Sequence, residues 1–134
     1  MGTATFPHPV KLITGIIASS ENGFSESEAL LQKEFGSIDY KSDILKFDFT
    51  NYYQKDMGSG LKRCFFSFER LIDPADLADV KLITNKLEDG ISKAISDAKR
   101  PVNIDPGYLS DAKLVLASTK NHSHRIYLDR KSVV

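Results

Sequence analysis

The sequence has little of several features that mark special classes of protein. It holds a single cysteine and no tryptophan, and its 18 basic and 18 acidic residues give a formal net charge of zero. A lone cysteine excludes an internal disulfide, and a balanced charge removes the broad positive field of a non-specific nucleic-acid binder. No apolar run approaches the ~18 residues of a membrane-spanning segment. Residues 1–11 lack the basic and apolar pattern of a signal peptide, so we expect a cytoplasmic protein without a membrane association.

The residues that are present suit one ordinary packed domain. The chain has 134 residues, of which 41% are hydrophobic and 27% are charged. A chain of this length can bury a single hydrophobic core. We therefore expect residues 1–134 to form one domain, with residues 1–8 as a flexible start. Cys64 lies in the apolar stretch RCFFSF, which favours a buried small hydrophobe over a reactive nucleophile.

Hydrophobic periodicity predicts five strands and two helices. The spacing of Ser25 and Glu28 is that of a capping box, and Gly36 suits a helix C-terminus. Asp73 is a good N-cap for the second helix, with Pro74 at its first position. The expected strands cover residues 10–18, 43–50, 61–71, 113–119 and 124–128, and the expected helices cover residues 26–35 and 74–99.

This order, β-α-β-β-α-β-β, predicts an α+β fold. We expect a two-layer sandwich in which two helices cover one face of a largely antiparallel sheet. The first six elements follow the split order of ferredoxin-like folds. The sequence shows no internal repeat beyond that weak two-fold pattern.

The segment from Val102 to Leu128 has the strongest concentration of polar side chains able to form a site. Lys120, His124 and Arg125 cluster at the predicted junction of the last two strands. Arginine offers a planar fork for phosphate or carboxylate, lysine a point charge, and histidine an exchangeable proton. These types together favour an anion site, although a solvated hairpin tip would also account for them. Asn103 and Asp105 precede Pro-Gly, so their side chains could simply stabilise a turn.

Other chemistries have weaker support. His122 and His124 would share one face of a strand, but no third ligand stands at a diagnostic spacing, so we predict no metal site.

Two stretches approach nucleotide-binding motifs without matching them. The stretch MGSGLKR precedes a strand and not a helix, unlike a phosphate-binding loop. The stretch TNKLED approaches the guanine-reading Asn-Lys-x-Asp pattern, yet it has Glu88 in place of Asp and lies inside a predicted helix. Tyr52 and Tyr53 lie near basic residues, which would suit stacking on a nucleic-acid strand. Aromatic residues in so small a domain are more often part of the core, so we do not expect nucleic acid as a partner.

Several stretches together resemble DUF4416, a prokaryotic family of unknown function. They are PVKLITGII, FDFTNYYQKDMG, LKRCFFSFERLIDPADLADVKLITNKLE and, most specifically, NIDPGYLSDAKLVLASTKNHSHRIYL. The resemblance implies no established reaction; some members carry a GTP-binding label, which the motifs in this chain do not support. The family pattern includes Tyr52, Tyr53, Met57, Gly58, Asn103, Asp105, Pro106, Gly107, Tyr108, Lys120, His124 and Arg125.

Two positions depart from that pattern. Asp56 stands where the family has Glu before Met-Gly, and the chain ends in KSVV where family members continue with strand-like sequence. A sheet that lacks a strand has an exposed edge, which is prone to pair with another chain. We therefore expect a homodimer or another homo-oligomer.

Two hypotheses for function follow. The first is a domain that binds an anionic small molecule, such as a nucleotide or a phosphorylated metabolite, between the 103–108 turn and the 120–125 hairpin. If it is an enzyme, Asp105 or His124 would be the general base, and Lys120 and Arg125 would stabilise charge. The alternative is a non-catalytic interaction module that uses an open sheet edge. The predicted ligand-binding residues are Asn103, Asp105, Tyr108, Lys120, His124, Arg125, Tyr52 and Tyr53, with Asp56 beside the two tyrosines.

Overall fold

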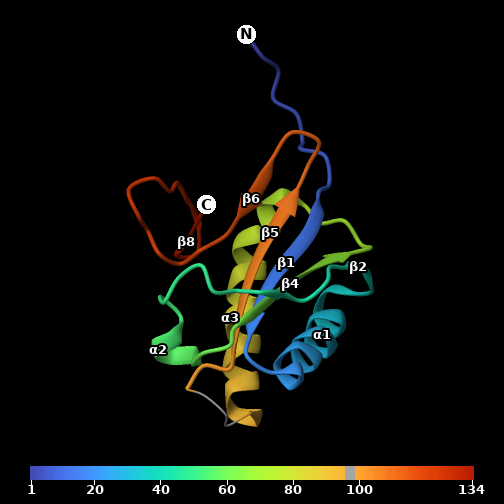
Figure 1. The fold of residues 1–134 in the computed structure, drawn as a ribbon. Coiled ribbons are helices and arrows are strands. Elements are labelled where there is room, and N and C mark those ends of the chain that lie inside the picture. Colours follow the sequence, from blue (N-terminus) through green and yellow to red (C-terminus); the bar gives the residue numbers. More distant parts are fainter. Residues whose placement is uncertain (96–98) are drawn as a thin grey trace.

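The computed structural model describes residues 1–95 and 99–134. Its centre is an antiparallel sheet with the strand order β2-β4-β1-β5-β6, and β3 also pairs with β4 (Figure 1). β4 separates β2 from β1, which is the split arrangement of ferredoxin-like folds. The strands are β1 (Lys11–Ala18), β2 (Ile38–Lys41), β3 (Leu45–Lys46), β4 (Lys62–Phe68), β5 (Val102–Leu109) and β6 (Leu114–Leu116). The predicted α+β class is confirmed.

Two long helices pack against one face of this sheet, and they also contact each other. They are α1 (Glu21–Phe35) and α3 (Leu77–Ala94), the latter preceded by a short 3-10 turn, η1 (Pro74–Asp76). A single helical turn, α2 (Gln54–Met57), lies in the connection before β4. The C-terminal residues form a separate two-stranded sheet of β7 (Tyr127–Asp129) and β8 (Ser132–Val133). No helix among the described residues has the length and apolar character needed to cross a membrane.

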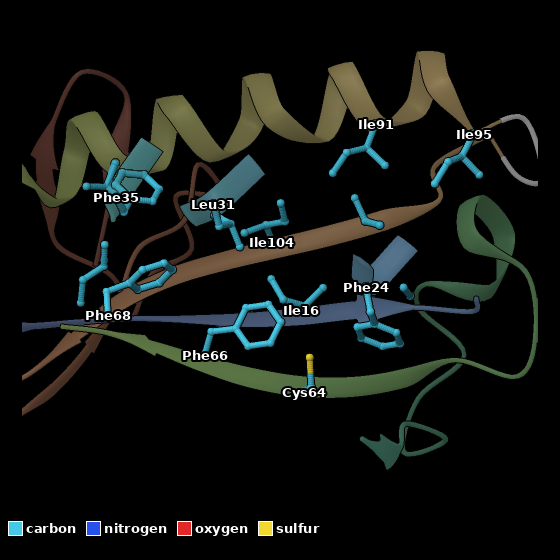
Figure 2. Close-up of a cluster of buried hydrophobic side chains, with 14 residues drawn as sticks. Ile16, Phe24, Leu31, Phe35, Cys64, Phe66, Phe68, Ile91, Ile95 and Ile104 are labelled. Carbon is cyan, nitrogen blue, oxygen red and sulfur yellow. The ribbon is translucent and has the colours of Figure 1, made fainter. Parts of the chain in front are cut away.

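The core lies between the sheet and the two helices. Alternate side chains of β1 and β4, including Ile16, Cys64 and Phe66, point toward the helices and are at most 4% exposed. Figure 2 shows these side chains gathered beneath α3. Phe35 of α1 meets Phe68 of β4 edge to face, with ring centroids 5.8 Å apart. The predicted burial of Cys64 is confirmed, and burial raises the pKa of its thiol to about 11.

The first helix begins earlier than the sequence pattern indicated. Ser20 is the N-cap, and its hydroxyl accepts a 3.1 Å hydrogen bond from the backbone N–H of Gly23. The predicted capping box at Ser25 is wrong, because four helical residues precede Ser25, and this earlier start brings Phe24 into the core. The predicted end at Gly36 is confirmed: its N–H donates to the carbonyl of Gln32, and its φ of 90° suits glycine.

The predicted strand over residues 43–50 is largely wrong. Only Leu45 and Lys46 pair with β4, and the edge strand β2 forms earlier in the chain. Leu45 is 53% exposed and Phe49 is 79% exposed, so their alternation marks no buried face. Phe47 instead packs against Tyr53, with ring centroids 5.8 Å apart, in a small cluster on the side of the sheet away from the helices.

The predicted turn at residues 103–108 is also wrong, because β5 runs straight through Asp-Pro-Gly. This strand pairs with β1 over its whole length. Pro106 is tolerated there because its missing N–H would face β6, at the point where the pairing between β5 and β6 stops. The carbonyl of Pro106 accepts a 3.0 Å hydrogen bond from Ala117, but proline has no N–H to return one. From Ala117 onward the chain leaves the sheet.

The last two predicted strands exist in shorter form and do not form a hairpin. β6 pairs with β5, whereas β7 pairs with β8. Ser118 and Val133 exchange backbone hydrogen bonds of 2.9 and 2.8 Å, which hold the C-terminal sheet beside the end of β6. The helix predicted to reach Lys99 ends at Ala94, followed by an extended Ile95. Residues 96–98 of that predicted end lie outside the described residues.

Candidate functional site

A pocket with a volume of about 540 Å³ lies beside the half of β5 that β6 does not cover. Four segments line it: one face of α3, the start of β5, the segment from Leu116 to Arg125, and Tyr53 from the connection before β4. The pocket therefore occupies the space that a longer β6 would fill.

Charged side chains of α3 take over the hydrogen bonds that a neighbouring strand would supply. The N–H of Ile104 donates to Oε1 of Glu88 at 2.7 Å, and Nζ of Lys81 donates to the Ile104 carbonyl at 3.4 Å. Lys81 and Glu88 lie two turns apart on one helix face, so both reach the same strand. An exposed strand edge has unpaired polar groups, and here these side chains satisfy them.

The same side chains continue into a hydrogen-bonded wall. Lys81 is only 6% exposed, and its Nζ lies 3.6 Å from Oδ1 of Asp105. Asn103 donates to the other carboxylate oxygen of Asp105 at 2.7 Å and accepts a hydrogen bond from Arg100. Arg100 in turn lies 3.8 Å from Glu88. Two cations and two carboxylates thus balance within this wall, and the network holds Asn103 and Asp105 in place.

Burial perturbs two titratable groups at the pocket. Desolvation raises the pKa of Glu88, while the hydrogen bond from Ile104 opposes that change. Desolvation also raises the pKa of the Tyr53 hydroxyl, and the carboxylate of Asp105 raises it further. Both groups are therefore biased toward their protonated, neutral forms relative to the free side chains.

Two further cations stand on the opposite wall. Arg125 donates 2.6 Å hydrogen bonds to the Ser118 hydroxyl and to the carbonyl of Lys120. Lys120 donates to the hydroxyl of Tyr52, and its Nζ lies 4.3 Å from the centroid of the Tyr52 ring. Within the described part of the chain, neither cation forms an ion pair with a carboxylate.

The structure brings together the two ends of the polar C-terminal segment. Asn103, Asp105, Lys120 and Arg125 all line this pocket, and Tyr53 lines it from a third direction. Tyr52 reaches the pocket only through its contacts with Lys120 and with the ring of Tyr53, whose centroid is 5.1 Å from its own.

Four other residues named from the sequence lie elsewhere. Tyr108 lines a separate surface hollow at the far end of β5, beside the N-terminal segment. His122 and His124 are exposed, and their rings stack with centroids 5.9 Å apart. Asp56 lies 3.9 Å from Lys99 and outside the pocket lining. No group of three potential metal-ligating side chains occurs among residues 1–95 and 99–134.

Sequence reasoning missed the contribution of α3 to the pocket. Lys81, Asn85 and Glu88 recur at helical spacing, and that polar stripe was the available signal. Asn85 and Glu88 also belong to the TNKLED stretch, which does lie at the pocket, but within a helix rather than in a base-reading loop. No local sequence pattern indicated that Arg100 belongs to the pocket.

A family model described as "Domain of unknown function (DUF4416)" matches residues 8–132. The chain belongs to the DUF4416 family. This match confirms the resemblance found in the sequence motifs. Neither the curated proteins nor the solved structures contain a match to this chain. The family description assigns no reaction, so the chemistry of the pocket is the guide to what this DUF4416 domain does.

Proposed function

We propose that this domain binds a small anionic molecule, of the phosphorylated-metabolite or nucleotide class, in the pocket beside β5. The observation that carries the proposal is the contrast between two pairs of cations at one pocket. Lys81 and Arg100 have carboxylate partners, whereas Lys120 and Arg125 have none among the described residues. An anionic ligand would supply the negatively charged partner that these two cations lack among the described residues.

The rest of the pocket suits such a ligand. Its volume of about 540 Å³ falls within the range of roughly 300–1,000 Å³ typical of small-molecule sites. Arg125 presents a fork that matches phosphate or carboxylate oxygens, and the neighbouring Thr119 adds a hydroxyl. If chemistry follows binding, Asp105 is the better candidate for a general base, because His124 is not part of the pocket lining.

A thermal-shift screen followed by calorimetry tests this proposal. Inorganic phosphate, sugar phosphates and nucleotides should raise the melting temperature, because a ligand of the folded state stabilises it. The double variant Lys120→Ala/Arg125→Ala should lose most of that shift. A charge-matched control is Lys33→Ala/Lys93→Ala, which removes two exposed lysines on α1 and α3 away from the pocket. A site variant that keeps every shift of the wild type, or a wild type that responds to no anion, would show that the proposal is wrong.

A second candidate is self-association through the edge strand β6, which is the last strand on its side of the main sheet. Leu114 of β6 and its cross-strand neighbour Leu109 are 60% and 41% exposed. The occupant we propose is a second copy of the chain, because two identical antiparallel edges are self-complementary. Sedimentation should detect a dimer that Leu114→Lys dissociates. A wild type that stays monomeric at high concentration contradicts this second candidate.

A further inference from the structure

A second, smaller hollow adjoins the pocket on the sheet face that the helices leave uncovered. Its volume is about 120 Å³, and it shares Tyr53, Asp105 and Leu116 with the larger pocket. Because three residues line both spaces, one molecule can occupy the two together. Leu116 stands at their junction and is 52% exposed, so an apolar group bound there would cover it.

The floor of the small hollow depends on Gly15 of β1. A methyl group at this position would lie 3.1 Å from Cε1 of Phe65 on the neighbouring strand. Glycine therefore leaves depth that any other residue would reduce. Asp105 is the β5 partner of Gly15 in the strand register, which places the floor of the small hollow directly beside the polar wall of the larger pocket.

The walls of the small hollow are flat. The guanidinium of Arg63 stacks against two rings, at 4.9 Å from the centroid of Phe47 and 5.1 Å from that of Phe65. Flat faces favour a flat guest.

We infer that the ligand carries a flat heteroaromatic ring in addition to its anionic group. The ring occupies the hollow among Gly15, Phe65 and Arg63, and the anionic group meets Lys120 and Arg125. The space is of the right order, since an apolar cavity of roughly 150 Å³ holds a benzene ring. The inference rests on the proposed function and narrows it to ring-bearing phosphates, which excludes simple sugar phosphates as the preferred ligands.

Matched ligands separate the two parts of the inference. Calorimetry compares AMP and CMP with ribose 5-phosphate, which lacks the base, and with adenosine, which lacks the phosphate. A base that stacks in the small hollow should make at least one nucleotide about tenfold tighter than ribose 5-phosphate. Lys120→Ala/Arg125→Ala should weaken AMP and ribose 5-phosphate alike, because both use the anion site.

Variants of the small hollow should affect only the ring. Phe65→Ala removes one flat wall, and Gly15→Val fills the floor; each should abolish the advantage of the nucleotide and leave ribose 5-phosphate unchanged. Tyr40→Ala removes an exposed aromatic ring on the edge strand β2 and is the control. Phe65 is 37% exposed, so its truncation should fold even if Gly15→Val does not.

The outcomes distinguish this inference from the proposed function. If ribose 5-phosphate binds but neither nucleotide binds more tightly, the anion site stands and the ring inference is overturned. The ring inference is equally overturned if Phe65→Ala keeps the full nucleotide advantage. If adenosine binds and loses affinity in Phe65→Ala while no phosphate contributes, the ring site stands and the anion proposal is wrong.

Discussion

The two halves of β5 satisfy their outer edge in different ways. From Gly107 to Leu109 the strand pairs with β6, whose backbone supplies the hydrogen bonds. At Ile104 the same edge is served by the side chains of Glu88 and Lys81 from α3. Pro106 stands between the halves and ends the pairing, because it has no N–H. Where side chains replace a strand, the space of that strand stays open, and this space is the pocket.

The comparison also explains why Lys81 and Glu88 are not free to act as ligand-binding groups. Lys81 and Glu88 are committed to the backbone of Ile104, and burial of such groups is tolerable only when they are paired. The candidate anion-binding charges, Lys120 and Arg125, come from the segment that leaves the sheet. Support of the strand edge and the proposed recognition of a ligand thus involve different residues of one pocket.

The largest expected loss of stability comes from a substitution in the half of β5 that pairs with β6. In Gly107→Ala the new methyl group would lie 2.4 Å from the carbonyl oxygen of Val115, so β6 must shift away from β5. We expect a loss of about 3 kcal/mol in the free energy of unfolding, measured by urea denaturation. The control is Gly90→Ala in α3, where the added methyl meets open space among the described atoms; it should stabilise the helix by about 1 kcal/mol. Equal stabilities of the two variants would contradict the close approach at Gly107.

The next largest loss of stability is expected in the open half of β5, where α3 side chains satisfy the strand edge. Glu88→Leu removes the acceptor of the Ile104 N–H and leaves a buried donor unsatisfied. Such a change should cost about 2 kcal/mol of unfolding free energy. Glu88→Gln keeps an oxygen acceptor of the same length and should lose far less. Hydrogen exchange at the Ile104 amide gives a local measure: it should accelerate in Glu88→Leu, and an unchanged rate would show that Glu88 does not serve this edge.

The smallest effect is a pH dependence confined to the open half. Because burial raises the pKa of Glu88 in the folded state, its protonated form favours folding. The contribution is fully present below the ordinary value of 4.5 and is lost as the pH rises through the raised pKa of the folded protein. The stability of the wild type relative to Glu88→Gln should therefore fall with increasing pH across that window. A difference that is flat, or that grows with pH, would contradict the raised pKa.

Some elements were predictable because short-range patterns determine them. The N-cap predicted at Asp73 is correct, since its carboxylate accepts a 2.8 Å hydrogen bond from the N–H of Ala75. The apolar stretch around Cys64 correctly indicated that this side chain is buried. The strand predicted over residues 43–50 failed because Phe47 packs on Tyr53 and Phe49 is exposed, so neither ring enters the core. Periodicity shows that a segment has two faces, but not what covers either one.

The sequence by itself determined the end of α1 at Gly36 and the N-cap at Asp73, because each depends on neighbours within a few residues. It also determined the α+β class, because that class follows from the order of the elements along the chain. Only the tertiary structure decided that Asp-Pro-Gly lies in a strand, since β1 must be present to pair with it. The same is true of the pocket. Its walls come from α3, β5 and the segment after β6, and their hydrogen bonds join residues that are distant in the chain. A local pattern cannot specify such partners, because they exist only once the sheet and the helices have packed.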